Sequence, residues 1–505
     1  MLLTVLAQAW EQPSVDYHAL APEIVLAGVI VLVLIVDLVS DERTKWATST
    51  LAGLGLIGSS IPLLTLAVSD EGARQAILGN GGYIVDDFSL VLKALFLVAG
   101  YIVVLLSTNY VEEGDYYQGE YYVLLLSSIL GMVMMASSRD LVSMFIALEF
   151  LSIPAYMLAA WRKRDPKSNE AGVKYLLMGV FASAVMLYGM TLLFGVSGTT
   201  LFTGINEYIA ANDVEPVVTL GIVFLVIGFA FKVSAVPFHT WAPDTYEGAP
   251  TPITAFLSVA SKAAGFVAML QLVFVAFPSA KEVWQPLFWV LAAASMTLGN
   301  LVALRQTNIV RMLAYSSVAQ GGFILMPLAV VGEGADASTD ALVAVVTYLL
   351  VYAAMNLGAF GVVMAVARKT RSGEISSYGG LFGYAPALAV LMSVFLFSLA
   401  GIPPLGGWIA KFAVFRALLS AGGPWAVTLA VIGAVNSVIA LFYYAAVAKE
   451  MWMNPAPDGD ETPIRVPQSL GAALAITAAL TVALGVLPNA VLRFGDIADS
   501  FVALP

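Results

Sequence analysis

The chain has 505 residues, of which 60% are hydrophobic and only 11% are charged, and its mean hydropathy is +0.89. Because a soluble domain carries about 25% charged residues, this chain lacks the charges to cover a soluble fold, and lipid must surround most of its surface. The net charge of −11 argues against a nucleic-acid partner. With no cysteine and only two histidines, the chain cannot hold disulfides, Fe–S clusters or a His-based metal cluster.

Apolar runs of roughly 17–25 residues, long enough to span a bilayer, recur along the whole chain. The first run lacks a basic leader and a cleavage site, so we interpret it as a retained span. Helices are required because lipid offers no partner for free backbone groups. We therefore predict an all-α polytopic membrane protein with about fourteen transmembrane helices, near residues 20–39, 46–68, 88–108, 120–137, 141–161, 170–196, 217–241, 252–277, 283–304, 308–330, 341–367, 385–419, 425–449 and 468–488.

The orientation follows from the basic residues of the loops, which favour the cytoplasmic side. The loop 161–170 carries four of them, and alternation of the spans places 13 Lys and Arg residues on its side against four on the other. We predict that this side is cytoplasmic, that both termini are external, and that the membrane is a bacterial inner membrane. The acidic loop 111–120 fits less well, but acidic residues count little in this rule.

Four ionisable residues lie well inside predicted spans, where a charge costs about 2.5–3.5 kcal/mol to insert. They are Glu149, Lys232, Lys262 and Lys411. Any one of them could be a structural ion-pair partner, but four together favour a path for ions or protons. Three further basic residues lie close enough to a helix end to extend to the interface, and we expect Glu23 to be interfacial as well; the three are Lys93, Lys174 and Arg416.

Two of the spans should be broken beside a lysine. Pro237 cannot supply an N–H to the helix that carries Lys232, and a Gly/Pro run precedes Lys411. Irregular backbone at this depth is tolerated only where it is buried in protein or lines a wet cavity, so each lysine should have water and carbonyl acceptors nearby. The predicted breaks contain Pro237, Gly401, Pro403, Pro404, Gly406 and Gly407.

His239 follows Pro237 at the predicted cytoplasmic end of span seven. A capping or loop role is at least as plausible for it as admitting or gating protons. The two broken spans, seven and twelve, are five apart, and an odd offset inverts the topology. Helices 4–8 (120–280) and 9–13 (281–450) could therefore form two inverted repeats of the kind found in transporters, flanked by helices 1–3 (1–119) and by a loop with helix 14 (451–505).

The segment FKVSAVPFHTWAPDTYEGAPTPITAFLSVASK (231–262) resembles the antiporter-like membrane subunits of respiratory complex I, the proton-pumping NADH:quinone oxidoreductase. Its ending and the run AGIPPLGGWIAKF (400–412) are most similar to the N-type subunit. The resemblance implies that Glu149 and Lys232 form the acid and base of a first half-channel. It also implies that Lys262 is a central relay and Lys411 the terminal site of a second half-channel.

The resemblance further implies partners and cofactors outside this chain. The other membrane and peripheral subunits of complex I would hold NADH, FMN, Fe–S clusters and quinone, and we expect no cofactor in this chain. Two other functions stay open: a subunit of a multisubunit cation/proton antiporter, and a membrane scaffold. A scaffold has no use for charges at mid-membrane, and co-purification with NADH dehydrogenase activity would separate the first two.

Overall fold

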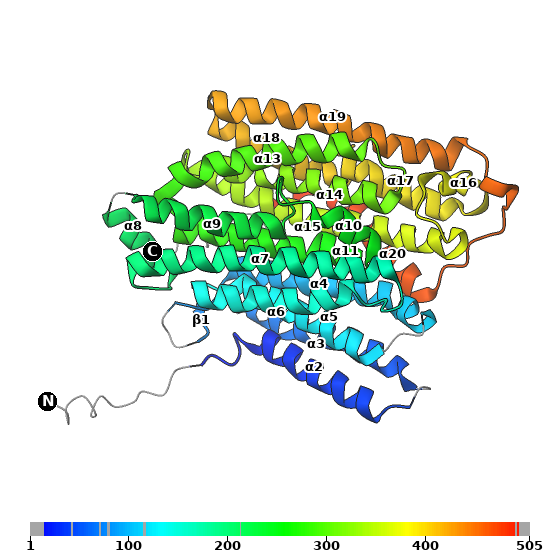
Figure 1. Cartoon of the computed structure of the whole chain (residues 1–505), viewed down its shortest axis with the longest axis horizontal. Helices are drawn as coiled ribbons and strands as arrows, with labels where there is room; N and C mark the ends of the chain where they lie inside the picture. The colour runs from blue at the N-terminus through cyan, green and yellow to red at the C-terminus, as the bar shows by residue number, and fades with distance from the viewer. Residues whose placement is uncertain are drawn as a thin grey trace.

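The structure is a computed structural model that describes residues 15–41, 44–69, 72–77, 81–114, 118–212, 214–489 and 492–493. It is a bundle of helices lying side by side, with α2 at one edge and α19 at the other (Figure 1). The α-helices are α2 (Ala21–Val39), α3 (Trp46–Val68), α4 (Asp87–Glu113), α5 (Gln118–Ser137), α6 (Leu141–Ala159), α7 (Pro166–Ser197), α8 (Phe202–Ala211), α9 (Pro216–Lys232), α10 (Trp241–Gly248), α11 (Thr251–Phe256), α12 (Lys262–Gln271), α13 (Lys281–Ala303), α14 (Ile309–Leu325), α15 (Ala335–Thr370), α16 (Leu381–Tyr384), α17 (Pro386–Ala400), α18 (Gly406–Ala421), α19 (Gly423–Met453) and α20 (Gln468–Val486).

Shorter elements complete the described chain. Two π-helical segments, η2 (Leu257–Ser261) and η3 (Leu272–Ala276), flank α12, so that α11 to η3 form one continuous helix. The strands β1 (Arg74–Gln75) and β2 (Ile84–Val85) form a small antiparallel hairpin, with Arg74 opposite Val85. Neither this hairpin nor the short helix α8 was predicted from the sequence, because neither has the long apolar run that marks a span.

Twelve helical segments of the described chain are long and apolar enough to cross a membrane, and two shorter apolar helices, α9 and α17, accompany them. The predicted all-helical, many-span architecture is therefore confirmed. Four helices begin with an ordinary side-chain cap, since Asp86, Asp140, Asp165 and Asn308 each accept hydrogen bonds from the first turn of the helix that follows. The number fourteen and the two inverted repeats stay predictions.

Burial increases from the edges of the bundle to its centre. The outer helices α2, α7 and α19 expose large apolar side chains such as Leu34, Phe181 and Phe442, as expected where lipid replaces water. The continuous helix α11 to η3, α14 and α15 are the most deeply buried of the candidate spans. Any buried polar side chain on these three central segments must find its partner inside the protein.

Two helices are interrupted beside a lysine. The chain leaves helical geometry after Lys232, passes through residues 233–240 and resumes as α10. It does so again after Ala400, and α18 begins at Gly406. Pro237, Gly401, Pro403 and Pro404 lie within these interruptions. Gly407 is required where α18 meets α17, because a Cβ there would lie only 1.7 Å from the Ser398 carbonyl oxygen.

Ion pairs group the loops into two ends of the bundle. Glu113 pairs with Arg368, and Glu247 pairs with Lys167 and Arg311, at one end. At the other end the pairs are Arg74 with Asp16, Lys281 with Glu333 and Arg416 with Asp340. This grouping agrees with the predicted alternation, and at the basic end Glu113 of the acidic loop pairs with Arg368. The predicted positions of the two termini lie outside the described residues.

The prediction that Lys93 extends to the interface was wrong. Lys93 does not extend to the interface: it is completely buried, and its Nζ lies 2.6 Å from Glu23 Oε1. Glu23 is also buried, and it accepts a hydrogen bond of 2.6 Å from the Tyr83 hydroxyl. Each charge satisfies the other across α2 and α4, which removes the need to reach water.

Candidate functional site

Lys232 is the last residue of α9, at the first interruption, and is 3% exposed. Its Nζ donates hydrogen bonds to Ser152 Oγ at 2.7 Å and to the Tyr175 hydroxyl at 3.3 Å. The rings of Tyr156 and Tyr175 lie with their centroids 5.8 and 5.6 Å from Nζ, within the range of a cation–π contact. Lys232 is thus held by hydroxyls and aromatic faces of α6 and α7.

Glu149 lies on α6, and its Oε1 accepts a hydrogen bond of 2.7 Å from Ser183 on α7. It forms no ion pair within 4.0 Å of Lys232. Ser183, which bonds Glu149, and Ser152, which bonds Lys232, line a cavity of ≈ 10 Å³ together with Lys232, which has room for about one water molecule. Lys232 and the two serines that bond the acid and the base therefore share this cavity.

Lys262 is the first residue of α12, directly after the π-helical segment η2, and is 1% exposed. Its Nζ donates to Ser317 on α14 twice, to Oγ at 2.6 Å and to the carbonyl oxygen at 2.7 Å. Tyr352 on α15 donates to the same Oγ at 2.9 Å. π-helical turns occur often at functional sites, and Lys262 directly follows such a segment.

Lys411 on α18 points back to the second interruption. Its Nζ donates to the Ala400 carbonyl oxygen at 2.8 Å, and it lies 4.6 Å from the centroid of the Phe323 ring. The side chain is 4% exposed. The carbonyl is free because α17 ends there: Gly401 has a positive φ of 90°, and a Cβ on it would lie 2.7 Å from Lys411 Cδ. The lysine and the interrupted backbone thus satisfy each other.

The predicted position of His239 was wrong. It lies inside the interruption and not at the end of a span, because α10 continues the path of the helix beyond it. His239 is 8% exposed, its Nδ1 has no hydrogen-bond partner among the described residues, and its ring centroid lies 6.5 Å from that of Tyr315. No contact described here assigns it a role in admitting or gating protons.

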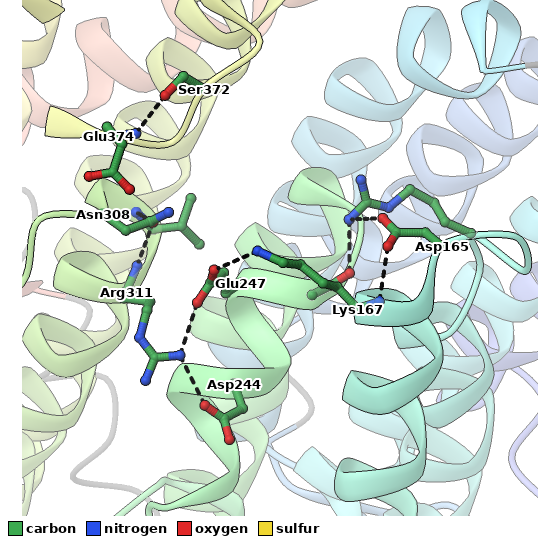
Figure 2. A network of polar contacts seen from close by, with 11 residues as sticks. Asp165, Lys167, Asp244, Glu247, Asn308, Arg311, Ser372 and Glu374 are labelled. Carbon is green, nitrogen blue, oxygen red and sulfur yellow. Dashed lines mark hydrogen bonds and ion pairs between the residues drawn. The ribbon is translucent and has the colours of Figure 1, made fainter. Parts of the chain in front are cut away.

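The sequence analysis missed an ionic network at the basic end of the bundle. Figure 2 shows Arg311 reaching from α14 to Asp244 and Glu247 on α10, with both N–O distances 2.9 Å. Lys167 and Lys174 of α7 pair with the same two carboxylates, at 3.2 and 2.7 Å. The network therefore fastens α10, the segment beyond the first interruption, to α7 and α14. The spacing of Asp244 and Glu247, three residues apart on one helical face, was the available signal.

The two carboxylates stay charged because their partners outweigh burial. Burial by itself raises the pKa of Asp244. The hydrogen bonds from Lys174 and Arg311 lower this pKa by more than burial raises it, so the net pKa lies below its usual value. Glu247 shows the same balance: burial raises its pKa, and hydrogen bonds from Arg311 and Lys167 bring it below the usual range. Both carboxylates are therefore ionised at neutral pH.

Buried glutamine and tyrosine side chains were also missed. Gln320, Tyr348 and Tyr444 form hydrogen bonds with one another in the centre of the bundle. Glutamine and tyrosine carry too little hydropathy signal to stand out in an apolar span. Within the described residues, no three His, Cys, Asp or Glu side chains gather in a way that could hold a metal ion.

Comparison with known proteins places these features in a family. The family model described as NADH:quinone oxidoreductase/Mrp antiporter, TM, matches residues 138–438, a range that contains all four predicted ionisable site residues. Subunit N of the NADH-quinone oxidoreductase of Moorella thermoacetica is 41% identical over 94% of this chain and 96% of its own length. Subunit N from Trichlorobacter lovleyi is 38% identical over 96% of this chain and 97% of its own.

Solved structures agree. A chain of respiratory complex I from Thermus thermophilus with bound aureothin is 31% identical and superposes with a TM-score of 0.76, covering 94% of this chain and 98% of that one. A chain of the Mrp complex from Dietzia sp. superposes with a TM-score of 0.84 and the same kind of coverage, 96% and 98%, but at 20% identity it shows only the shared fold. This multi-pass membrane chain therefore belongs to the family of NADH:quinone oxidoreductase and Mrp antiporter membrane subunits.

Proposed function

We propose that this chain is the N-type, proton-translocating membrane subunit of an NADH:quinone oxidoreductase. The relatives of about 40% identity over nearly its whole length carry that subunit name. We further propose that protons pass along Glu149, Lys232, Lys262 and Lys411. Redox chemistry would occur in partner subunits, which would hold NADH, FMN, Fe–S clusters and quinone.

One observation carries the relay. Lys232, Lys262 and Lys411 are all nearly fully buried, yet none of the three pairs within 4.0 Å with a carboxylate that the structure describes. A lysine that only braces two helices is normally neutralised by a carboxylate, because an unpaired buried charge is costly. A lysine held by hydroxyls and carbonyls can release its proton without leaving an opposite charge behind. This is the environment that a proton carrier needs.

The arrangement suggests how Glu149 acts on Lys232. A carboxylate that approaches a lysine favours its protonated form, and here Glu149 is bonded to Ser183 and forms no ion pair within 4.0 Å of Lys232. We propose that this is the separated state, in which Lys232 can pass its proton towards Lys262. The helix that carries Lys262 packs directly on Lys232: a Cβ on Gly265 would lie 3.3 Å from Lys232 Cβ.

The finer topology belongs to the same proposal. Counting α9 and α17 each as part of an interrupted span brings the twelve candidate spans to fourteen, with two inverted repeats at 120–280 and 281–450 and both termini on the external side of a bacterial inner membrane. The runner-up function, a subunit of a cation/proton antiporter, shares the fold. The difference between about 40% identity to subunit N and 20% to the Mrp chain favours complex I.

Substitution of Lys232 by arginine tests the relay. Arginine keeps the positive charge, but its pKa above about 12 prevents it from releasing a proton. We expect Lys232→Arg to assemble, as a native gel would show, and to lose proton pumping to the same extent as Lys232→Ala. The measurement is quinone-dependent NADH oxidation together with ΔpH formation in inverted membrane vesicles.

The matched control is Lys281→Arg, since Lys281 is a half-exposed lysine paired with Glu333 at the bundle end. That variant should pump normally. Full pumping by Lys232→Arg would reduce Lys232 to a structural brace, and would leave Lys262 and Lys411 as the only carriers. Absence of NADH dehydrogenase activity from the purified assembly would instead favour the antiporter.

A further inference from the structure

The helix α14 lies between two of the proposed proton carriers. Ser317 on α14 holds the Nζ of Lys262, and Phe323, less than two turns further along, lies under the Nζ of Lys411. Between these two residues α14 carries Gln320, which is 1% exposed. Gln320 is therefore a buried polar residue on the stretch of α14 that links the contacts of the two lysines.

The side-chain amide of Gln320 is fully engaged. Its Nε2 donates to the Leu399 carbonyl oxygen at 2.9 Å and to the Tyr444 hydroxyl at 3.3 Å. Its Oε1 accepts a short hydrogen bond from the Tyr348 hydroxyl. Leu399 directly precedes Ala400, whose carbonyl oxygen accepts a hydrogen bond from Lys411 Nζ. Gln320 is thus fastened to the same end of α17 as Lys411.

The orientation of this amide is fixed by chemistry. A carbonyl oxygen only accepts hydrogen bonds, so the NH₂ group of Gln320 must face Leu399. Its Oε1 then faces Tyr348, whose hydroxyl must donate its only hydrogen there. A flipped amide would place two acceptors against each other at Leu399. The contacts therefore admit one arrangement only.

Two sets of hydroxyl groups lie on the stretch between Ser317, which holds Lys262, and Gln320. Tyr352 and Tyr348 are one turn apart on α15, and Tyr352 bonds the Ser317 Oγ that holds Lys262. Ser316, next to Ser317, shares a hydrogen bond of 2.5 Å with Tyr444. Both sets end on the amide of Gln320. Lys411 lies on the other side of it.

A primary amide interrupts a proton chain. A hydroxyl or a water molecule can accept one proton while it donates another, whereas an amide NH₂ group only donates. We propose that Gln320 is a gate between Lys262 and Lys411: it blocks proton transfer while its NH₂ group is held by the Leu399 carbonyl, and transfer requires that this bond open and water take its place. This inference rests on the proposed relay.

Removing the amide should leave the gate open. Gln320→Ala creates space that water can fill, whereas Gln320→Met keeps the volume but offers no proton path. The measurement is the decay rate of an imposed ΔpH in inverted vesicles containing the assembled complex, corrected for vesicles that lack it. We expect Gln320→Ala to speed the decay by about fivefold or more, the factor that corresponds to one hydrogen bond of ordinary net strength. In vesicles with Gln320→Met the imposed ΔpH should decay slowly, and less ΔpH should form during NADH oxidation.

Two controls make the result specific. Gln271 is another fully buried glutamine, but its amide bonds the carbonyls of Met135 and Ala136 in α5, so Gln271→Ala should not accelerate the decay. Adding Lys411→Ala to Gln320→Ala should restore the slow decay, because the open gate then leads to no carrier. If Gln320→Ala fails to assemble, Gln320→Ser replaces it: it removes the amide, its hydroxyl can both accept and donate a proton, and it should act in the same direction.

The outcomes separate the gate from the relay. Decay at the wild-type rate in Gln320→Ala, or fast decay that persists without Lys411, overturns the gate. Lys411→Ala alone distinguishes the two proposals: normal pumping by this variant would overturn the relay itself. If Lys411→Ala loses pumping while the ΔpH in Gln320→Ala vesicles decays at the wild-type rate, only the gate is overturned.

Discussion

The buried pair of Lys93 and Glu23 gives a prediction whose magnitude can be worked out from the structure. Lys93→Met removes a fully buried ammonium group that lies 2.6 Å from Glu23. The carboxylate, with only a tenth of its side chain exposed, would retain just the hydrogen bond from Tyr83. Breaking a buried pair in this way costs about 3–5 kcal/mol, or roughly two to four factors of ten in the ratio of folded to unfolded protein.

The double variant Glu23→Gln with Lys93→Met should recover most of that loss. It leaves no buried charge, and the glutamine oxygen can still accept from Tyr83, so we expect a cost below about 2 kcal/mol. The assay is the melting temperature of the detergent-solubilised complex for both single variants and the double variant. Arg416→Met, at a half-exposed pair with Asp340, is the control and should change it little. Wild-type melting of Lys93→Met, or a double variant as unstable as the sum of the two single ones, would refute the reasoning.

Three further predictions concern the site and its surroundings. Glu149→Gln should assemble, because the amide can still accept from Ser183, but should reduce coupled activity; unchanged pumping would mean that Glu149 does not modulate Lys232. In this cysteine-free chain, cysteines at the exposed positions Arg164 and Ser279 should label from opposite sides of the membrane, with Arg164→Cys on the cytoplasmic side; labelling from one side would contradict the topology. The pKa of Asp244 and that of Glu247 are lowered in the folded state, so the stability that they contribute is complete above their unfolded pKa values of about 4. It is lost as the pH falls through their lower folded pKa values, and Arg311→Leu should flatten that acid-side decline in melting temperature.

Hydropathy and charge along the chain were enough to predict the kind of protein and to single out its deeply buried lysines. A bilayer requires long apolar runs, and a charge inside one is costly enough to stand out. Lys232, Lys262 and Lys411 were found in this way and prove to be buried in the centre of the bundle. The acceptor of Lys411 was also foreseeable, because the Gly/Pro run that frees the Ala400 carbonyl lies only a few residues before it.

The partners of the other charges were decided by the packing of distant helices. Lys93 lies near a helix end in the sequence, which suggested an interfacial position, but its partner Glu23 is on α2. Lys262 is held by Ser317, and the amide of Gln320 by Leu399, across separations of 55 and 79 residues. Hydropathy is a property of each residue by itself, whereas a hydrogen bond depends on which helix faces which. The sequence therefore determined which apolar segments carry a charged residue. Only the tertiary structure determined what each charge and each buried amide is bonded to.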